Sequence, residues 1–313
     1  YKILVERSRN ALDLAQEQRG FSTVDGTMIN SVLLEAFMRD SRAKGQNYCV
    51  VSIDIQAAFD SVHHESIVNS LRRMGIEDET IDYIQEHYRH LSTTLTCGQQ
   101  VMGEIDFAVG VKQGDPLSPI IFNAVMDKLL ATLPKEIGGL IAGRRIPILA
   151  FADDLILLSN DTPSMQLQLD ILGSFLRSEG LKVNINKCYA LRVERVPGRS
   201  RHQLAVMTKG QLKLEGKFLP TVGAIDSFKY LGRNVGFMGH LKPNNIQNLS
   251  DDLSSLQSAP LKSHQKMELL RTYLIPRYIY GFQNFKLEKQ TLINADRLLR
   301  RFVRRTLHLH SAV

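Results

Sequence analysis

Cysteine is scarce in this sequence of 313 residues. Cys49, Cys97 and Cys188 lie far apart and form no C-x-x-C pair. Neither a disulfide framework nor a zinc site is therefore indicated, and this cysteine usage fits a reducing compartment. Because all three lie in apolar or strand-like contexts, we expect them to be buried as small hydrophobic side chains.

Long hydrophobic runs are also missing. The sequence contains no stretch of about 18 apolar residues and no basic segment followed by an apolar leader. We therefore expect no membrane partner. The chain opens on Tyr1 rather than on methionine, which predicts that it is a fragment of a longer protein.

The composition is that of an ordinary soluble globular protein, with 43% hydrophobic and 23% charged residues. A chain of 313 residues can form one large domain or two, with a sizeable core. The net charge of +7 and the pI near 9.3 indicate a polyanionic partner, with nucleic acid ahead of a membrane surface. Solubility alone explains the charge equally well.

Two adjacent acids, Asp153 and Asp154, interrupt the apolar stretch 148–158. Burial of one ionised carboxylate without a partner already costs several kcal/mol, and this stretch contains no cation. A divalent metal is the simplest external charge, since Mg²⁺ is usually held by one or two acids together with substrate phosphates. Taken alone, an Asp-Asp pair is more typical of a β-turn than of a metal site.

A third acid, Asp54, stands near the end of a second β-rich run, residues 48–55. If the two runs pair as neighbouring strands, Asp54 lies opposite Asp153. Such a pair of carboxylates can hold two metal ions roughly 3.5–4 Å apart, which clamp the attacking and leaving oxygens of a phosphoryl displacement. The third acid therefore favours a metal site over a simple turn.

At this point the sequence resembles reverse transcriptases, because five segments match motifs of that family in the same order. These segments are residues 54–60 (DIQAAFD), 110–119 (GVKQGDPLSP), 151–154 (FADD), 180–187 (GLKVNINK) and 228–232 (FKYLG). Five matches in one order are hard to obtain by chance. The resemblance implies an RNA-directed DNA polymerase.

The resemblance also implies a right-hand polymerase fold of the α+β class. Strands and helices alternate along the chain without a regular βαβ rhythm, which fits this class better than a doubly wound sheet. We expect reverse transcriptase fingers and palm with an antiparallel sheet over residues 1–240, with the N-terminal part of the fingers missing. An all-helical thumb is expected over residues 241–313. Paired strands are expected at 91–97 and 104–109.

The catalytic and metal-binding residues follow from the same resemblance. Asp54, Asp153 and Asp154 are expected to be catalytic. Asp54, Ile55 and Asp153 are expected to bind two Mg²⁺ ions, which Mn²⁺ can replace. Bound metal would lower the pKa of a primer 3′-hydroxyl and neutralise charge on the triphosphate. Asp60 closes the first motif, but its side chain can point elsewhere from a strand end, so we leave it out of the ligands.

Phe59, Gln113, Gly114 and Lys187 resemble the nucleotide-binding positions of the family. A bulky residue at Phe59 would exclude a ribose 2′-hydroxyl, so deoxynucleoside triphosphates are the expected substrate. The glycine-bearing loop at Gln113 would bring the backbone close to the nucleotide, and Lys187 would carry charge toward the pyrophosphate. As alternatives, Phe59 is a core residue, the loop only starts a helix, and Lys187 is a surface lysine.

Two further segments are candidates for contact with nucleic acid. The turn at Tyr230, Leu231 and Gly232 resembles the hairpin that holds the primer strand. Residues 191–220 are rich in arginine and lysine, including Arg192. This charge fits a solvated basic hairpin and a nucleic-acid contact equally well.

The C-terminal region carries a second basic signal. Helical spacing would gather five arginines on one face, opposite Leu298, Leu299, Phe302 and Leu307. The arginines are Arg297, Arg300, Arg301, Arg304 and Arg305. Such a face can follow phosphates, as in the thumb of a reverse transcriptase, or it can be an ordinary solvated face.

Segments outside the catalytic motifs resemble non-LTR retrotransposons, most closely the clade that inserts into ribosomal RNA genes. They are residues 19–21 (RGF), 92–95 (STTL), 259–262 (APLK), 269–271 (LLR) and 274–277 (LIPR). This resemblance implies target-primed reverse transcription of element RNA into cDNA, in the nucleus. The partners would be an RNA template, a DNA primer or target DNA, and deoxynucleoside triphosphates.

Three other functions are compatible with the sequence. A group II intron or retron reverse transcriptase shares the palm motifs, and a nucleotide cyclase also uses paired acids on a palm-type sheet. A nucleic-acid-binding fragment would keep the fold without catalysis, because the chain is expected to lack the family's N-terminal strand and its endonuclease. The intact aspartates favour catalysis, and the basic tail speaks against a cyclase. No oligomeric state follows from the sequence.

Overall fold

The structure is a computed structural model that describes residues 12–98, 100–106, 108–196, 203–237, 239–240, 245–284 and 289–309. The chain divides into two compact units, Tyr1–Gly239 and His240–Val313. This division lies beside the boundary expected at residue 240. Each unit has its own hydrophobic core.

A five-stranded antiparallel sheet forms the centre of the first unit, in the order β11–β10–β1–β8–β7. Its strands are β1 (Tyr48–Ile53), β7 (Ile148–Phe151), β8 (Asp154–Ser159), β10 (Tyr189–Arg195) and β11 (Leu204–Val206). β1 and β8 are direct neighbours, and Ile53 pairs with Leu155. The strand that leads to Asp54 and the strand that begins at Asp154 therefore meet at one end of the sheet.

Helices and short hairpins surround this sheet. Those that precede β7 are α2 (Gly26–Ala43), β2 (Ile55–Gln56), α3 (Ala58–Ser61), α4 (His64–Arg73), α5 (Asp78–Arg89), β3 (Ser92–Cys97), β4 (Gln100–Asp106), α6 (Ser118–Thr132), β5 (Gly139–Ile141) and β6 (Arg144–Ile146). Those that follow β8 are α7 (Thr162–Ser178), β9 (Lys182–Val183), β12 (Lys213–Leu214), β13 (Lys217–Phe218), β14 (Ser227–Tyr230), β15 (Arg233–Gly236) and β16 (Gly239–His240).

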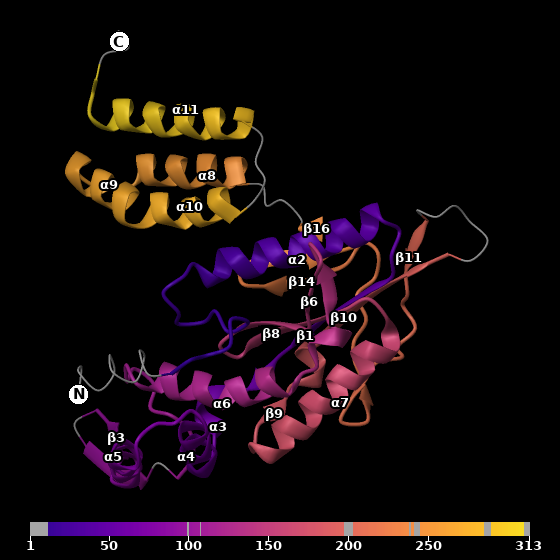
Figure 1. The fold of residues 1–313 in the computed structure, drawn as a ribbon. Helices are drawn as coiled ribbons and strands as arrows, with labels where there is room; N and C mark the ends of the chain where they lie inside the picture. Colours follow the sequence, from indigo (N-terminus) through magenta and orange to yellow (C-terminus); the bar gives the residue numbers. More distant parts are fainter. Residues whose placement is uncertain are drawn as a thin grey trace. The chain divides into compact units, whose positions relative to one another are not determined.

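Both faces of the sheet are buried, because its strands are runs of apolar residues whose successive side chains point to opposite faces. Val51, Ile53 and Leu155 belong to the core that includes α6 and α7, whereas Val50 and Leu158 belong to the core that includes α2, β14 and β15. Figure 1 shows α2 on one side of the sheet and α6 and α7 on the other. A one-residue slip would exchange the two faces, so double burial fixes the register that aligns the acidic ends of the strands.

Local sequence signals set the helix ends. α2 begins after Asp25, whose carboxylate accepts the N–H of Met28 at 3.0 Å. α7 begins after Asp161, whose carboxylate accepts the N–H of Ser164 at 2.7 Å. These side chains satisfy backbone donors that a helix leaves unpaired at its N-terminus. They therefore fix the residues at which α2 and α7 begin.

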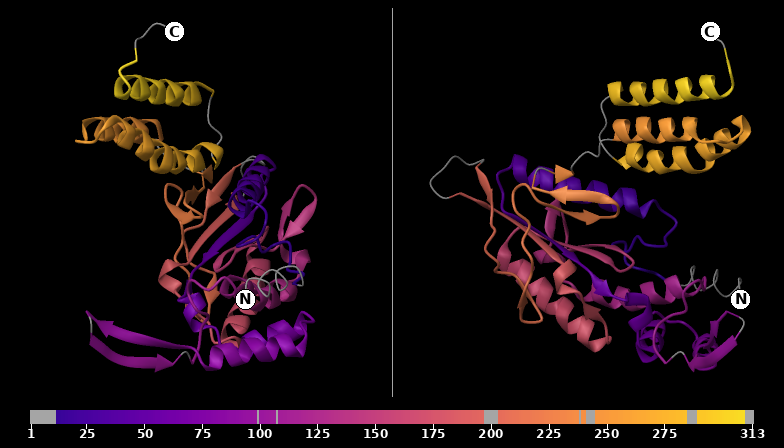
Figure 2. Two further views of the ribbon diagram at one scale, coloured as in Figure 1. Left: turned by 90° about the vertical axis from the view of Figure 1, so that its left-hand side faces the viewer. Right: turned by 180° about the vertical axis from the view of Figure 1, so that it is seen from behind.

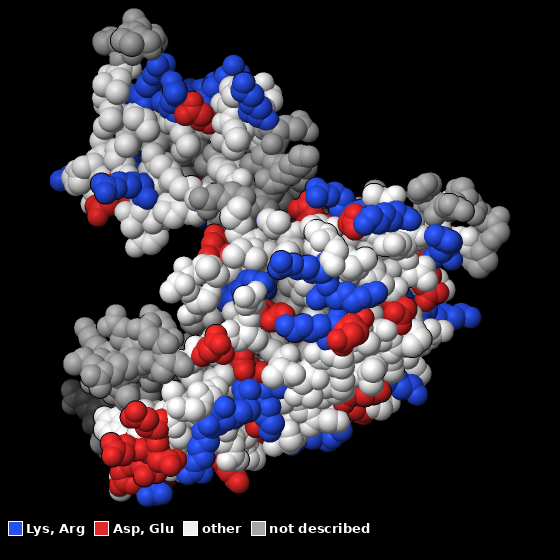
Figure 3. Space-filling view, in the orientation of Figure 1, with Lys and Arg blue, Asp and Glu red and all other residues white. Residues whose placement is uncertain are grey.

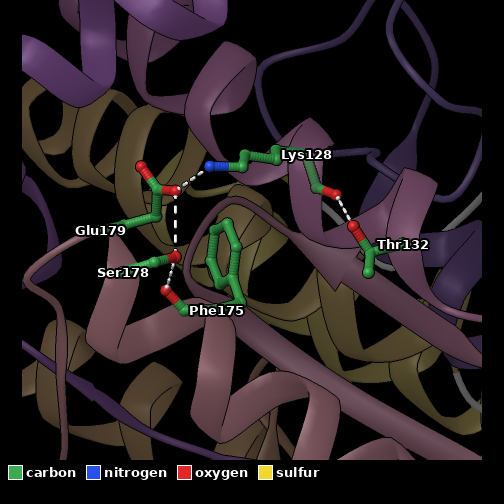
Figure 4. Close-up of polar contacts among 5 residues, drawn as sticks. All are labelled: Lys128, Thr132, Phe175, Ser178 and Glu179. Carbon is green, nitrogen blue, oxygen red and sulfur yellow. Dashed lines mark hydrogen bonds and ion pairs between the residues drawn. The ribbon is translucent and has the colours of Figure 1, made fainter.

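An ion pair joins α6 to the C-terminal end of α7. Lys128 on α6 lies 2.5 Å from the Glu179 carboxylate, which also accepts the Ser178 hydroxyl at 3.2 Å (Figure 4). Glu179 is only 3% exposed, so its charge depends on these partners. The helix that follows the expected nucleotide loop is thereby fixed to the helix that follows the acidic hairpin.

Almost every residue of the β3–β4 ribbon is exposed, and Figure 2 shows the ribbon extending away from the helices. The strand expected at 104–109 is observed as β4, which spans Gln100–Asp106 and so begins earlier and ends earlier than expected. Cys97 is exposed, which corrects the prediction that all three cysteines are buried. The ribbon pairs only with itself among the described strands, so no core covers this residue.

The second unit is helical. It contains α8 (Asn245–Ser258), α9 (Ser263–Leu269), a π-helical turn (Leu270–Leu274), α10 (Ile275–Asn284) and α11 (Lys289–Thr306). Leu298, Leu299 and Phe302 of α11 pack into its core, as the helical spacing predicts. Leu307 does not, because α11 ends at Thr306 and the leucine is 43% exposed. The identification of this unit as a thumb stays a prediction.

Candidate active site

A tight hairpin between β7 and β8 presents Asp153 and Asp154. Phe151 pairs with Asp154, so only Ala152 and Asp153 form the turn. Ala152 has φ 54°, in the left-handed region that a residue with a Cβ rarely adopts. The Asp153–Asp154 pair therefore does form part of a β-turn, as the alternative interpretation predicted. The same turn also lies beside a third acid, Asp54.

Asp54 follows the last residue of β1. Continuing the register of Ile53 with Leu155 by one residue sets Asp54 across from Asp154. This corrects the expectation that Asp54 lies opposite Asp153, because Asp153 belongs to the turn and not to the strand. The backbone of Asp54 is held on its other side, where its N–H donates to the Cys188 sulfur at 3.4 Å and its carbonyl accepts the N–H of Asn184 at 2.8 Å.

The pKa values of Asp153 and Asp154 are both raised, by burial first and by neighbouring carboxylate charge second. For Asp153, burial comes first and the charge of Asp54 adds to it. For Asp154, reduced solvation together with the charges of Asp153 and Asp54 raises the pKa to about 6, although the residue retains solvent contact. No cation of the described chain contributes to either shift. The described residues therefore leave the negative charge of this group uncompensated.

This charge suits a divalent cation. Within the described residues, no group of three or more His, Cys, Asp or Glu side chains is arranged to hold a metal ion alone. Mg²⁺ is usually held by only one or two protein carboxylates, with water and substrate phosphates completing its shell. Ile55, the third expected ligand, has a buried side chain and offers only its backbone carbonyl.

Phe59 lies on α3 and belongs to a cluster of three aromatic rings. Its ring stacks on that of Phe122 with centroids 4.3 Å apart, and Phe21 meets it edge-on at 6.2 Å. Phe122 is fully buried, whereas Phe59 is only half-buried. The Phe59 side chain therefore packs on the core and also keeps a partly exposed surface. Its interpretation as a core residue and its interpretation as a nucleotide-binding residue are compatible.

Gln113 has a partner that the sequence did not indicate. Its side-chain amide donates to both Asp60 carboxylate oxygens, at 2.9 and 3.2 Å. Gly110 is required for this approach, because it has φ 88° and a Cβ there would lie 2.7 Å from the Asp60 carbonyl oxygen. Gly114 has φ 85° with open space around it. Asp60 thus holds the nucleotide loop to the first acidic motif.

Lys187 ends a 3₁₀ turn (Ile185–Lys187) and is exposed. The strand before it, β9, pairs with β2, and Ile55 lies opposite Val183. The segment is therefore attached directly to the strand that follows Asp54. Its position fits either a charge near the leaving group or a surface lysine.

The expected primer-grip residues form a second tight turn. Tyr230 pairs with Arg233 across it, and both turn residues, Leu231 and Gly232, have positive φ, 45° and 74°. Tyr230 is buried, and its hydroxyl accepts from the Asn30 side chain at 3.2 Å. Only Leu231 and Gly232 are therefore accessible to a primer.

Five arginines of α11 are exposed, as expected, and Figure 3 shows Lys and Arg side chains gathered on the visible face of that helix. Arg300 pairs with Asp296 at 2.8 Å, so its charge is partly compensated. In the basic stretch 191–220, Arg192 is only 3% exposed and contacts Glu194 at 3.2 Å. This arginine fits neither hypothesis for the stretch, because it is a buried structural residue.

Several residues near the acids were not singled out from the sequence. Gln18 and Asn30 bond to the β7–β8 hairpin, and Cys188 bonds to Asp54. The only sequence signal for the first was its position beside the segment 19–21. Uncharged side chains that hydrogen-bond to backbone groups leave no recognisable pattern in the sequence, so these contacts could be identified only from the structure.

The fold and the site define the class of protein. The model of the family described as reverse transcriptase (RNA-dependent DNA polymerase) matches residues 2–235, three quarters of the chain. The chain belongs to the reverse transcriptase family. This confirms the expected α+β polymerase fold.

Relatives place the chain within that family. It is 39% identical over 313 residues to a Pol polyprotein from the type-1 retrotransposable element R2 of Popillia japonica, covering 99% of this chain and 43% of the relative. It is 34% identical over 307 residues to that of the type-2 element R2DM of Drosophila melanogaster, covering 98% and 29%. The chain is a non-LTR retrotransposon reverse transcriptase sequence, and it spans less than half the length of these relatives.

Solved structures share the fold. Telomerase from Candida tropicalis in complex with a fragment of telomeric RNA matches with a TM-score of 0.52 at 11% identity, covering 99% of this chain and 56% of that one. The apo enzyme from the same organism matches with a TM-score of 0.50 at 10% identity, covering 97% and 54%. No described helix has the length and apolarity that a membrane crossing requires.

Proposed function

We propose that this chain is the RNA-directed DNA polymerase of a non-LTR retrotransposon, which copies element RNA into cDNA by target-primed reverse transcription. One observation supports this most strongly. Asp54, Asp153 and Asp154 meet at one sheet end in a chain of the reverse transcriptase family, and the pKa values of Asp153 and Asp154 are raised with no cation of the described residues contributing to either shift. Family membership also favours a polymerase over a nucleotide cyclase.

The aspartates would hold two Mg²⁺ ions, or Mn²⁺ in their place, through Asp54, Asp153 and the carbonyl of Ile55, with Asp154 beside them. Bound metal would activate the primer 3′-hydroxyl and neutralise charge on the triphosphate. The carboxylates bind metal in the ionised form. Because the pKa of Asp154 is about 6, metal affinity should weaken below that pH.

The aromatic cluster would select the sugar. Phe122 lies flat against Phe59, and Phe21 closes its edge, so the Phe59 ring has few alternative positions. A rigid ring of this size excludes a 2′-hydroxyl by contact. Gln113, oriented by Asp60, and Gly114 would contact the incoming deoxynucleotide from the adjoining loop.

The nucleic-acid partners would be an RNA template and a DNA primer or target strand. The α11 arginines Arg297, Arg300, Arg301, Arg304 and Arg305 would contact phosphates, while Leu231 and Gly232 would contact the primer. Lys187 would place its positive charge near the leaving pyrophosphate. The reaction would take place in the nucleus.

Primer extension tests the proposal. Purified protein is incubated with an RNA template, an annealed DNA primer, Mg²⁺ and deoxynucleoside triphosphates, and product length is measured on a denaturing gel. We expect templated extension that chelation of Mg²⁺ abolishes. Binding of the duplex without any extension would instead identify a nucleic-acid-binding chain that retains only the fold.

A further inference from the structure

Two features disfavour the observed conformation of the β7–β8 hairpin tip. Ala152 adopts a left-handed φ that its Cβ disfavours. Asp153 and Asp154 are partly buried beside the like charge of Asp54, and burial first and this charge second raise the pKa of both. Both effects push the turn away from the observed conformation. An element outside the hairpin must therefore support it.

Gln18 provides this support. Its side-chain oxygen accepts the N–H of Ala152 at 2.8 Å and the N–H of Gly20 at 2.9 Å. Its amide nitrogen lies 3.4 Å from the Ala152 carbonyl oxygen. The side chain is only 5% exposed, and both lone pairs of its oxygen are used. One buried amide thus engages both backbone polar groups of the strained residue.

The backbone on either side of Gln18 follows the same hairpin. The N–H of Arg19 donates to the Ala150 carbonyl at 3.0 Å, and the N–H of Ala150 donates to the Glu17 carbonyl at 3.1 Å. Gly20 lies so close that a Cβ there would be 2.3 Å from the nitrogen of Ala152. The segment 17–20 therefore forms a close-fitting strap beside the acidic turn.

Rigid helices hold this strap. The N–H of Ala15 donates to the Asp127 carboxylate at 2.7 Å, and the Asn123 side chain donates to the Gly20 carbonyl at 2.8 Å. Both partners lie on α6, most of whose side chains are buried. From the other face, Asn30 on α2 donates to the Ala150 carbonyl at 3.0 Å. The strap thus transmits the position of the packed helices to the turn.

We propose that Gln18 is a positioning residue that fixes the Ala152–Asp153 turn and so keeps the Asp153 carboxylate in place for catalysis. The proposal rests on the proposed polymerase function, since it assigns Asp153 a role in the reaction. Gln18 contacts neither substrate nor metal in it. Its effect is exerted through two backbone N–H groups.

Replacement of Gln18 by Met tests this. Met keeps the length and burial of the side chain and removes its hydrogen bonds. A displacement of the catalytic group by about 1 Å can reduce the rate by on the order of 100-fold. We therefore expect kcat for single-nucleotide addition to fall about 10- to 100-fold, while KM for the nucleotide and Kd for the duplex change by about twofold at most.

Gln168 offers a matched control. It is also fully buried, and its amide donates to the carbonyls of Leu158 at 3.0 Å and Ile137 at 3.1 Å, at the opposite end of β8. Gln168→Met should lower stability as Gln18→Met does and leave kcat per folded molecule unchanged. Gly20→Ala disturbs the turn by steric contact instead, and it should lower kcat with Gln18 intact.

Hydrogen–deuterium exchange of the metal-free protein gives a readout that does not depend on activity. The amide of Ala152 should exchange faster in Gln18→Met than in wild type, and it should be unchanged in Gln168→Met. If wild type is inactive, the proposed function fails, and this exchange still decides whether Gln18 holds the turn. Equal kcat and equal Ala152 exchange in the two methionine variants would overturn the proposal.

Discussion

The cost of keeping Asp154 ionised should be measurable as stability. Burial first, and the charges of Asp153 and Asp54 second, raise its pKa from 3.8 to about 6, which corresponds to about 3 kcal/mol. Asp154→Asn removes the charge. Because Asp154 is exposed, water reduces this cost, and we expect a gain of about 1 kcal/mol at pH 7.5 in the absence of metal.

The sign of the effect depends on pH. A raised folded-state pKa means that the folded protein binds the proton more tightly than the unfolded chain does, so wild type loses stability as pH rises from about 4 to about 6. The advantage of Asp154→Asn should therefore be complete above pH 6 and shrink to a few tenths of a kcal/mol near pH 4. Millimolar Mg²⁺ should narrow it at pH 7.5, because a bound cation relieves the repulsion.

Urea unfolding at pH 4 and pH 7.5 measures this directly. Asp82→Asn, on the exposed face of α5, serves as a control and should change the free energy of unfolding by less than about 0.5 kcal/mol at either pH. Equal behaviour of Asp154→Asn and Asp82→Asn at pH 7.5 would refute the argument. The three carboxylates would then be independent surface acids.

Three further changes test other parts of the account. Phe59→Val should admit a 2′-hydroxyl and shift the ratio of ribonucleotide to deoxynucleotide incorporation by about 10- to 200-fold, or ~1–3 kcal/mol; an unmoved ratio would make Phe59 a core residue only. Changing Arg297, Arg301 and Arg305 together to Gln should flatten the slope of log affinity for duplex against log salt by ~2–3 units and shorten products, whereas an unchanged slope indicates a solvated face. Gly110→Ala should lower the free energy of unfolding by at least about 1–2 kcal/mol, measured by urea unfolding, because its φ of 88° disfavours a Cβ and the new Cβ would lie 2.7 Å from the Asp60 carbonyl oxygen. Unchanged stability would show that the loop can move.

The sequence predicted the acids and their strands well, because buried apolar runs around charged residues leave few alternatives. Asp54, Asp153 and Asp154 were brought to one sheet end as expected. The register error of one residue arose from the turn, since two residues suffice to reverse the chain and Asp153 occupies one of them. Apolar periodicity shows which strands are buried, but it does not show how many residues form the turn between two strands.

Contacts between uncharged polar groups and backbone were beyond sequence patterns. The bond from Gln113 to Asp60 joins residues that are 53 positions apart, and the support of Ala152 by Gln18 spans 134 positions. Neither has a spacing that local rules describe. The exact end of α11 was also not predicted. Leu307 continues the apolar spacing of the helix, but α11 stops one residue earlier and the leucine is exposed.

The central claim is that Asp153 acts in the chemical step. Asp153→Asn keeps the size of the side chain and removes its charge, and loss of metal stabilisation worth several kcal/mol corresponds to a fall of about 1,000-fold or more in rate. Single-nucleotide addition on an RNA template is measured at saturating duplex, with Asp82→Asn as control. We expect this loss in Asp153→Asn with duplex affinity within about twofold of wild type. Addition at the wild-type rate by Asp153→Asn would contradict the account.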